Sequence, residues 1–253
     1  MENLQHIGLL AAAFAAGAIN AVAGGGSLIS FPALIAFGFV SKTANVTNTV
    51  ALWPGYVGGS FGYRDELRRQ RRRLLALLPP SVAGALVGSI VLLSTPESAF
   101  GTIVPFMILF ACGLMAFQDR LSAFALAHRV SAQSDEHVPL ILLGATFVMA
   151  IYGAYFGAGL GIVMLAFLSI LLPDDIQHSN ALKGMLSLII NGVAVVYFVA
   201  FGPVRWTAMI VMGSGAVAGG YLGVGVARRL GRTWLRVAVI SYGLVVVAVM
   251  LLR

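Results

Sequence analysis

Long apolar runs separated by short polar turns dominate the 253-residue chain. They form two groups of five on either side of a polar stretch at 118–138. The first group comprises 7–22, 27–40, 46–62, 74–93 and 99–117, and the second comprises 139–155, 159–172, 180–201, 207–227 and 233–252. A helix needs about 20 apolar residues to cross a bilayer. We therefore expect 27–40 and 159–172 to be half-helices or arms of a re-entrant hairpin, and the other segments to span.

The composition sets the class of protein. Hydrophobic residues make up 59% of the chain and charged residues 10%, whereas a soluble domain is about 25% charged. So much apolar surface cannot be buried in one soluble core. The chain is therefore predicted to be an all-α polytopic membrane protein.

A glycine-rich signature occurs twice, once in each group of segments. The first copy runs from Asn20 through Gly24-Gly25-Gly26-Ser27 to Pro32, and the second runs from Gly153 to Ile162. Gly26 aligns with Gly159 at an offset of 133 residues, Asn48 with Asn180 at 132, and Gly84 with Gly219 at 135. We therefore expect two homologous repeats at 1–117 and 139–253, joined by a cytoplasmic connector at 118–138.

The arginines show how the two repeats are related. An arginine-rich loop at 63–73 follows the third segment of the first repeat, whereas the one at 228–236 follows the fourth segment of the second. Cytoplasmic loops carry the excess of Arg and Lys. The repeats are therefore predicted to be inverted, with 63–73, 118–138 and 228–236 in the cytoplasm of a multi-pass inner-membrane protein. Inversion permits five crossings per repeat, or three crossings plus a re-entrant pair.

Several function classes lack the residues they need. Every Asp and Glu falls in a terminus or loop of this map, so the carboxylate that a proton pump keeps inside its bundle is not evident. There is no phosphate-binding loop, and Cys112 is the single cysteine. We expect no cofactor, no metal and no nucleic acid, and we interpret the net charge of +7 as attraction to anionic lipid headgroups.

The glycine breaks are the candidate substrate site. A helix that restarts inside the membrane has N–H groups without partners, and these favour an anion. Ser27 is predicted to cap one restarting helix, and Lys183 to supply charge. The candidate substrate-binding residues are Asn20, Gly24, Gly25, Gly26, Ser27, Thr47, Asn48, Gly157, Gly159, Ser179, Asn180 and Lys183.

On these motifs the chain resembles the TauE/SafE family of sulfite exporters. The resemblance is carried by Asn20 to Ser27, by Pro32 and Gly38, and by Ala44-Asn-Val-Thr-Asn48, with a weaker second copy at Gly157 to Gly161. It implies a permease that moves a small sulfur-containing anion, such as sulfite or an organosulfonate, often outward. The second copy has Gly153 where the first has Asn20, so it departs from a strictly symmetric site.

Other functions remain open on the sequence alone. The chain could carry a different small anion, or be a membrane subunit that needs a partner. An intramembrane hydrolase would need a base within reach of Ser27, and His178 is the histidine nearest a repeat motif. A homodimer is also compatible with the sequence.

Overall fold

The computed structural model describes residues 2–22, 25–61, 64–127, 138–172, 176–230 and 232–252, and these contain helices and connecting turns without strands. The helices are α1 (Glu2–Val22), α2 (Ser27–Ala36), α3 (Ser41–Phe61), α4 (Arg64–Arg69), α5 (Arg71–Ser94), α6 (Glu97–Ala127), α7 (Leu140–Tyr155), α8 (Leu160–Leu171), α9 (Ile176–Phe201), α10 (Trp206–Leu230) and α11 (Arg232–Leu251). The predicted all-α architecture is confirmed.

Four helices are long and apolar enough to cross a membrane, judged on the described residues. Their spans are Arg71–Ser94, Glu97–Phe124, His178–Phe201 and Thr233–Leu251. In contrast, α2 has 10 residues and α8 has 12. At 1.5 Å per residue these two rise about 15 and 18 Å, roughly half of a bilayer core. The expectation of two short segments after the glycine breaks is confirmed.

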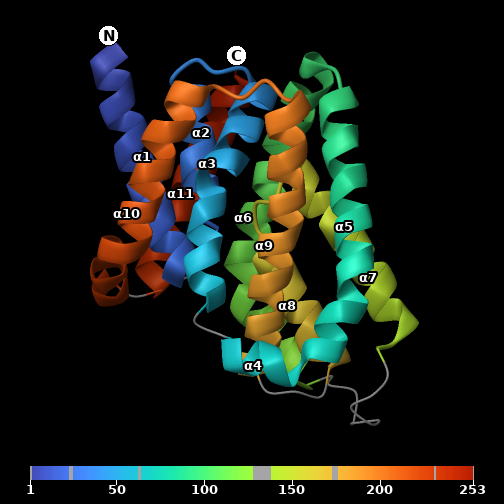
Figure 1. Cartoon of the computed structure of the whole chain (residues 1–253). Coiled ribbons are helices and arrows are strands. Elements are labelled where there is room, and N and C mark those ends of the chain that lie inside the picture. The colour runs from blue at the N-terminus through green and yellow to red at the C-terminus, as the bar shows by residue number, and fades with distance from the viewer. Residues whose placement is uncertain are drawn as a thin grey trace.

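The first short helix folds back along α1. The Gln5 side-chain amide donates to the Phe37 carbonyl at 3.1 Å, which joins the start of α1 to the turn after α2. The two helices therefore form a hairpin. Figure 1 shows α2 in the half of the molecule near the two chain termini, and α8 in the half near α4. Each repeat thus begins with a long and a short helix (α1–α2 or α7–α8), and three long helices follow (α3, α5 and α6, or α9, α10 and α11).

Helices of the first repeat pack against helices of the second. Helix α1 of the first repeat packs most extensively on α10 of the second, and α7 of the second packs in the same way on α5 of the first. Helices α3 and α9 pack on each other, as do α6 and α11. If each helix is replaced by its counterpart in the other repeat, the same pairs of packed helices result. This is the relation that a pseudo-two-fold axis requires.

Glycines allow the helices of the two repeats to pack closely. A Cβ atom added to Gly84 on α5 would collide with the Phe147 carbonyl oxygen on α7, and one added to Gly219 on α10 with the Phe14 carbonyl oxygen on α1. The glycines are 135 residues apart and their partners 133. Contact and sequence therefore agree on the same repeat register, and small residues allow this close helix approach.

The repeats are inverted, as predicted. Both termini lie at one end of the molecule, called here the terminal end, and α4 lies at the other, called the α4 end (Figure 1). Helix α1 starts at the terminal end, whereas its counterpart α7 starts at the α4 end. Four of the described helices have the length and hydropathy of a crossing, so the number of crossings per repeat stays a prediction.

Several details differ from the sequence map. Helix α10 extends to Leu230 and α11 begins at Arg232, so most of the loop expected at 228–236 is helical, and α5 begins at Arg71 within the loop expected at 63–73. The loop at 63–73 contains the short helix α4, whose Leu67 is buried. Helix α6 continues ten residues beyond 117, to Ala127, so the expected connector begins as helix. Residues 128–137 of that connector lie outside the described residues. Asp119, expected in a loop, is on α6 and pairs with Arg236 of α11 at 2.6 Å.

Candidate functional site

The tips of the two hairpins lie against the same stretch of α6. A Cβ on Gly25 at the first tip would collide with the Met115 side chain, and one on Gly159 at the second would lie 3.2 Å from Leu114. The ring of Phe31 on α2 meets that of Phe156 at the second tip edge to face, with centroids 5.5 Å apart. The fold therefore brings the two glycine breaks together beside α6.

The first break is closed by the protein itself. The Gly26 N–H donates to the Asn20 side-chain oxygen at 2.7 Å. A Cβ on Gly26 would collide with the Ala16 carbonyl oxygen of α1, so glycine is needed here for close packing. This donor, which the sequence offers to an anion, is occupied by Asn20. Gly24 lies outside the described residues.

The capping role expected of Ser27 is wrong. Helix α2 begins at Ser27, and Gly26 is its N-cap without a side-chain capping bond. A serine in the first helical position has helical backbone angles and cannot act as the non-helical flanking residue that capping requires. Asn20, from the preceding helix, binds the Gly26 N–H instead.

Both breaks contain glycines with positive φ angles, Gly25 at the first (+89°) and two glycines at the second. Gly157 and Gly159 have positive φ angles of +77° and +79°, and Gly159 is the left-handed N-cap of α8. Among the described residues, the N–H groups of Ala158, Gly159 and Gly161 make no backbone hydrogen bond. Unpaired N–H groups around left-handed glycines at a helix start form a concave anion site. The second break therefore has free donors.

Lys183 of α9 lies beside this second break. Its Cδ atom is 3.7 Å from the position that a Cβ on Gly161 would occupy. Asn180 is one helical turn earlier, and Ser187 and Asn191 continue the same face of α9 because residues three and four apart are neighbours on a helix. The result is a polar stripe on α9 that starts at the second break.

Three other predicted residues are buried. The Thr47 hydroxyl accepts the Arg205 N–H at 3.1 Å. Asn48 is 3% exposed, and its side-chain oxygen accepts the Ser30 hydroxyl at 2.6 Å, which joins α3 to α2. Ser179 is fully buried. Thr47 and Asn48 therefore contact neighbouring helices, whereas Asn180 and Lys183 are partly exposed.

Sequence reasoning did not select two residues that hold the second break. The Asn45 amide donates to the Tyr155 carbonyl, the last of α7, at 2.8 Å. The Tyr152 hydroxyl donates to the Ala158 carbonyl. Together they bind carbonyls on both sides of the break. Asn45 stands inside the Ala44–Asn48 motif, so its place in that motif was the available signal.

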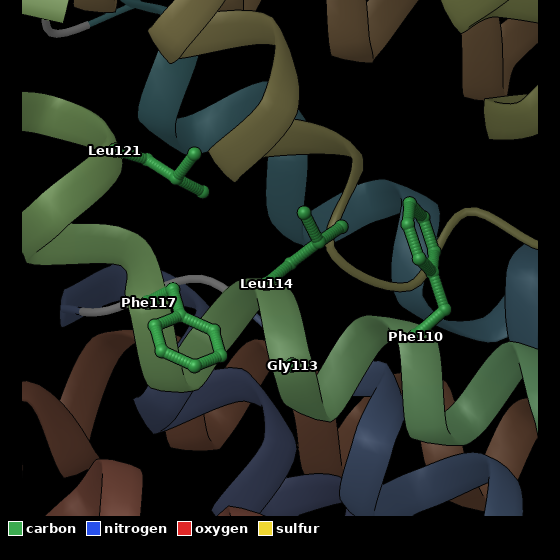
Figure 2. A pocket seen from close by; sticks show the side chains of 5 residues that line it. All are labelled: Phe110, Gly113, Leu114, Phe117 and Leu121. Carbon is green, nitrogen blue, oxygen red and sulfur yellow. The ribbon is translucent and has the colours of Figure 1, made fainter. Parts of the chain in front are cut away.

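A surface depression beside α6 is a poor candidate for this site. It has a volume of about 370 Å³ and is lined by Phe110, Gly113, Leu114, Phe117 and Leu121. Figure 2 shows all five along α6, a membrane-spanning helix, with no polar side chain among them. An apolar depression offers no donor to an anion.

Known proteins show the family of this chain. The family described as "Sulfite exporter TauE/SafE" matches residues 9–250. The chain belongs to that family. The chain is 27% identical over 243 residues to a "Probable membrane transporter protein" of Haemophilus influenzae, covering 96% of this chain and 92% of the relative.

A second relative agrees with this assignment. A "Probable membrane transporter protein ORF9" of Sinorhizobium sp is 26% identical over 219 residues, covering 85% of this chain and 80% of the relative. No solved structure matches. The chain is thus a multi-pass membrane transporter of the TauE/SafE type.

Proposed function

We propose that the protein transports a small sulfur-containing anion, which binds at the second glycine break. The observation that carries this proposal is the group of free N–H donors at Ala158, Gly159 and Gly161 beside Lys183. A sulfite or sulfonate group has several acceptor oxygens and a negative charge, so it matches both features. Asn180, one turn from Lys183, adds a side-chain amide.

The first repeat supports this site without supplying its main donors. Asn20 closes the first break, Asn48 joins α2 to α3, and Asn45 holds the end of α7. The expected symmetric site is replaced in this proposal by one binding tip and one packing tip. Movement of one repeat against the other then exposes the anion to each side in turn.

We propose that the direction is outward and that the α4 end faces the cytoplasm of the inner membrane. The family description as an exporter supports the direction. Exposed arginines at the α4 end, Arg68, Arg69, Arg71 and Arg72, support the orientation, since cytoplasmic ends carry the excess of positive charge. Anionic lipid headgroups would be the neighbours of this surface.

An enzymatic role is not part of the proposal. Membership of a transporter family supports this, and so does the placement of the hydrolase pair. Ser27 lies on α2, which packs on α1, α3, α6 and α11, whereas His178 lies on α9, which packs on α3, α4, α5, α7 and α8. A nucleophile needs its base within hydrogen-bond reach.

Thermal unfolding of the detergent-purified protein with a panel of anions tests the substrate class. The panel contains sulfite, thiosulfate, sulfate, sulfoacetate, taurine and simple carboxylates. We expect stabilisation by sulfur anions, reduced in Asn180→Ala and less affected in Asn48→Ala, since a ligand that binds only the folded state raises its stability. Stabilisation by carboxylates alone would show that the substrate is another kind of anion. In a transport assay, activity only in the presence of a second subunit would contradict transport by this protein alone.

A further inference from the structure

Gln70, in the turn between α4 and α5, holds the first turn of α9. Its side-chain nitrogen donates to the His178 carbonyl at 3.1 Å and to the Glu66 carbonyl at 3.4 Å. Since both partners are carbonyls, the orientation of the amide is set. The amide oxygen must then point away from them. The side chain is 6% exposed.

Two buried polar atoms meet no partner at this junction. The Gln70 amide oxygen and the Ser179 hydroxyl, next along the chain from the carbonyl that Gln70 binds, are both buried and without a hydrogen bond. Buried polar groups in native proteins are nearly always paired, and leaving one unpaired is costly. One of these atoms is an acceptor and the other a donor, so they are chemically able to pair with each other.

The pseudo-equivalent junction at the terminal end is joined. Thr47 corresponds to Ser179 at an offset of 132 residues, and Arg205 corresponds to Gln70 at an offset of 135. There the Thr47 hydroxyl accepts the Arg205 N–H at 3.1 Å. The Thr47–Arg205 pair is therefore bonded, whereas Gln70 reaches α9 through the His178 carbonyl and not through the Ser179 hydroxyl.

We infer that these two junctions are reciprocal latches of the transport cycle. In the structure the terminal latch (Thr47–Arg205) is closed and the α4 latch (Gln70–Ser179) is open. In the alternate state the Ser179 hydroxyl donates to the Gln70 amide oxygen, and Thr47 releases Arg205. Because α9 carries Asn180 and Lys183, Gln70 is a positioning residue for the substrate site. This inference rests on the alternating access of the proposed function.

Side-specific cysteine labelling tests the latches. The reporter is Ser187→Cys on the polar stripe of α9, in a Cys112→Ala background that removes the single native cysteine. Vesicles of both orientations are treated with a membrane-impermeant maleimide, and the ratio of the labelling rates from the α4 side and the terminal side is measured. The two single variants are Ser179→Ala and Thr47→Val, with Ser179→Thr as the control that keeps the hydroxyl.

The two variants should shift the ratio in opposite directions. Ser179→Ala removes a bond of the alternate state, so the ratio should rise about fivefold, the factor for one hydrogen bond of average net strength. Thr47→Val removes a bond of the present state, so the ratio should fall by a similar factor. The double variant should lie near the parent, as should Ser179→Thr. Ser179→Val should reproduce Ser179→Ala and replaces it if that variant does not fold, because it leaves the bonds of Gln70 to the His178 and Glu66 carbonyls in place.

Shifts of the same sign, or no shift in either variant, would overturn the latches. A role in stability alone predicts loss of folded protein without opposed shifts. The labelling needs no substrate, so it separates this inference from the proposed function. Opposed shifts without transport of any tested anion would contradict only the substrate class. Sulfur-anion transport with shifts of the same sign would contradict only the latches.

Discussion

The two hairpin tips share an origin in sequence but differ in how their backbone groups are used. At the first tip, Asn20 binds the Gly26 N–H, and Gly26 itself packs against the α1 backbone. Glycines with positive φ angles occur at both tips, Gly25 at the first and Gly157 and Gly159 at the second. At the second tip, neighbouring N–H groups are without backbone partners among the described residues. The first tip thus has one N–H group bound by a side chain, whereas the second has no such side-chain acceptor among the described residues.

This difference shows how a duplicated motif can divide its roles. Glycine permits both close packing and unusual backbone angles, so a glycine cluster in a sequence does not reveal which property is used. The neighbours decide between them. A side-chain acceptor precedes the first tip, whereas the corresponding position before the second is Gly153, which has no side chain. The second tip therefore has no counterpart of the Asn20 acceptor.

The largest expected effect is on the yield of folded protein, when one methyl group is added at the first tip and, for comparison, at the second. Gly26→Ala places a Cβ against the Ala16 carbonyl oxygen, which belongs to the backbone and cannot move aside, whereas Gly161→Ala has 3.7 Å to the Lys183 side chain. We expect little folded Gly26→Ala protein, because overpacking a tight contact costs about 1–3 kcal/mol or more. Gly161→Ala should fold. Size-exclusion profiles and unfolding curves would show this, and equal yields would contradict the packing role.

The next effect concerns charge at the second tip. Lys183→Met should reduce anion transport in proteoliposomes by about tenfold or more, since a hydrogen bond to a charged group is worth about 1.5–3 kcal/mol. Lys183→Arg should keep most of the activity. The matched control is Lys42→Met, which removes the only other lysine; Lys42 donates to the Leu93 carbonyl. Equal losses in the two Met variants would remove Lys183 from the site.

A smaller effect is expected from releasing the end of α7. Asn45→Leu removes the donor to the Tyr155 carbonyl and leaves that carbonyl without its side-chain partner, at a cost of about 1–3 kcal/mol. Chemical unfolding in mixed micelles would measure it. Sulfite-induced stabilisation should weaken as well, because the second tip loses a support. An unchanged response to sulfite would show that Asn45 supports the fold alone.

The smallest change in stability should follow from removing the Asn20 side chain that binds the first tip. Asn20→Ala removes the acceptor of the Gly26 N–H, and loss of such a bond at a helix start costs about 1 kcal/mol. Asn20→Asp keeps an acceptor and should remain near the parent. Anion-induced stabilisation should persist in both variants. Its loss in Asn20→Ala, with stability retained, would show that the first tip binds substrate too.

Much of the fold could be predicted because its signals are local. Apolar runs of bilayer length, two short segments after glycine breaks, and displaced arginine loops are all visible along the chain. The helix α4 was missed because its six residues are mainly charged, and it is anchored by Leu67, whose burial depends on neighbouring helices. The extension of α6 was missed since polar residues replace apolar ones beyond 117, although the backbone stays helical.

The site was less predictable, and particular residues show why. Asn48 and Asn180 are equivalent in sequence, but Asn48 is buried against Ser30 and Asn180 is partly exposed. Thr47 and Ser179 are also equivalent, but one hydroxyl has a partner and the other does not. Each difference depends on a residue from another helix, far away along the chain.

The sequence by itself determined the membrane class, the two inverted repeats, the family and the existence of two glycine breaks. These follow from hydrophobicity, charge bias and spacing, which act along the chain. The tertiary structure alone decided that α2 folds back along α1, that the two tips meet beside α6, and that Asn20 binds a backbone donor at the first tip. The physical reason is that a backbone N–H is free or bound according to what packs against it, and that partner comes from elsewhere in the fold.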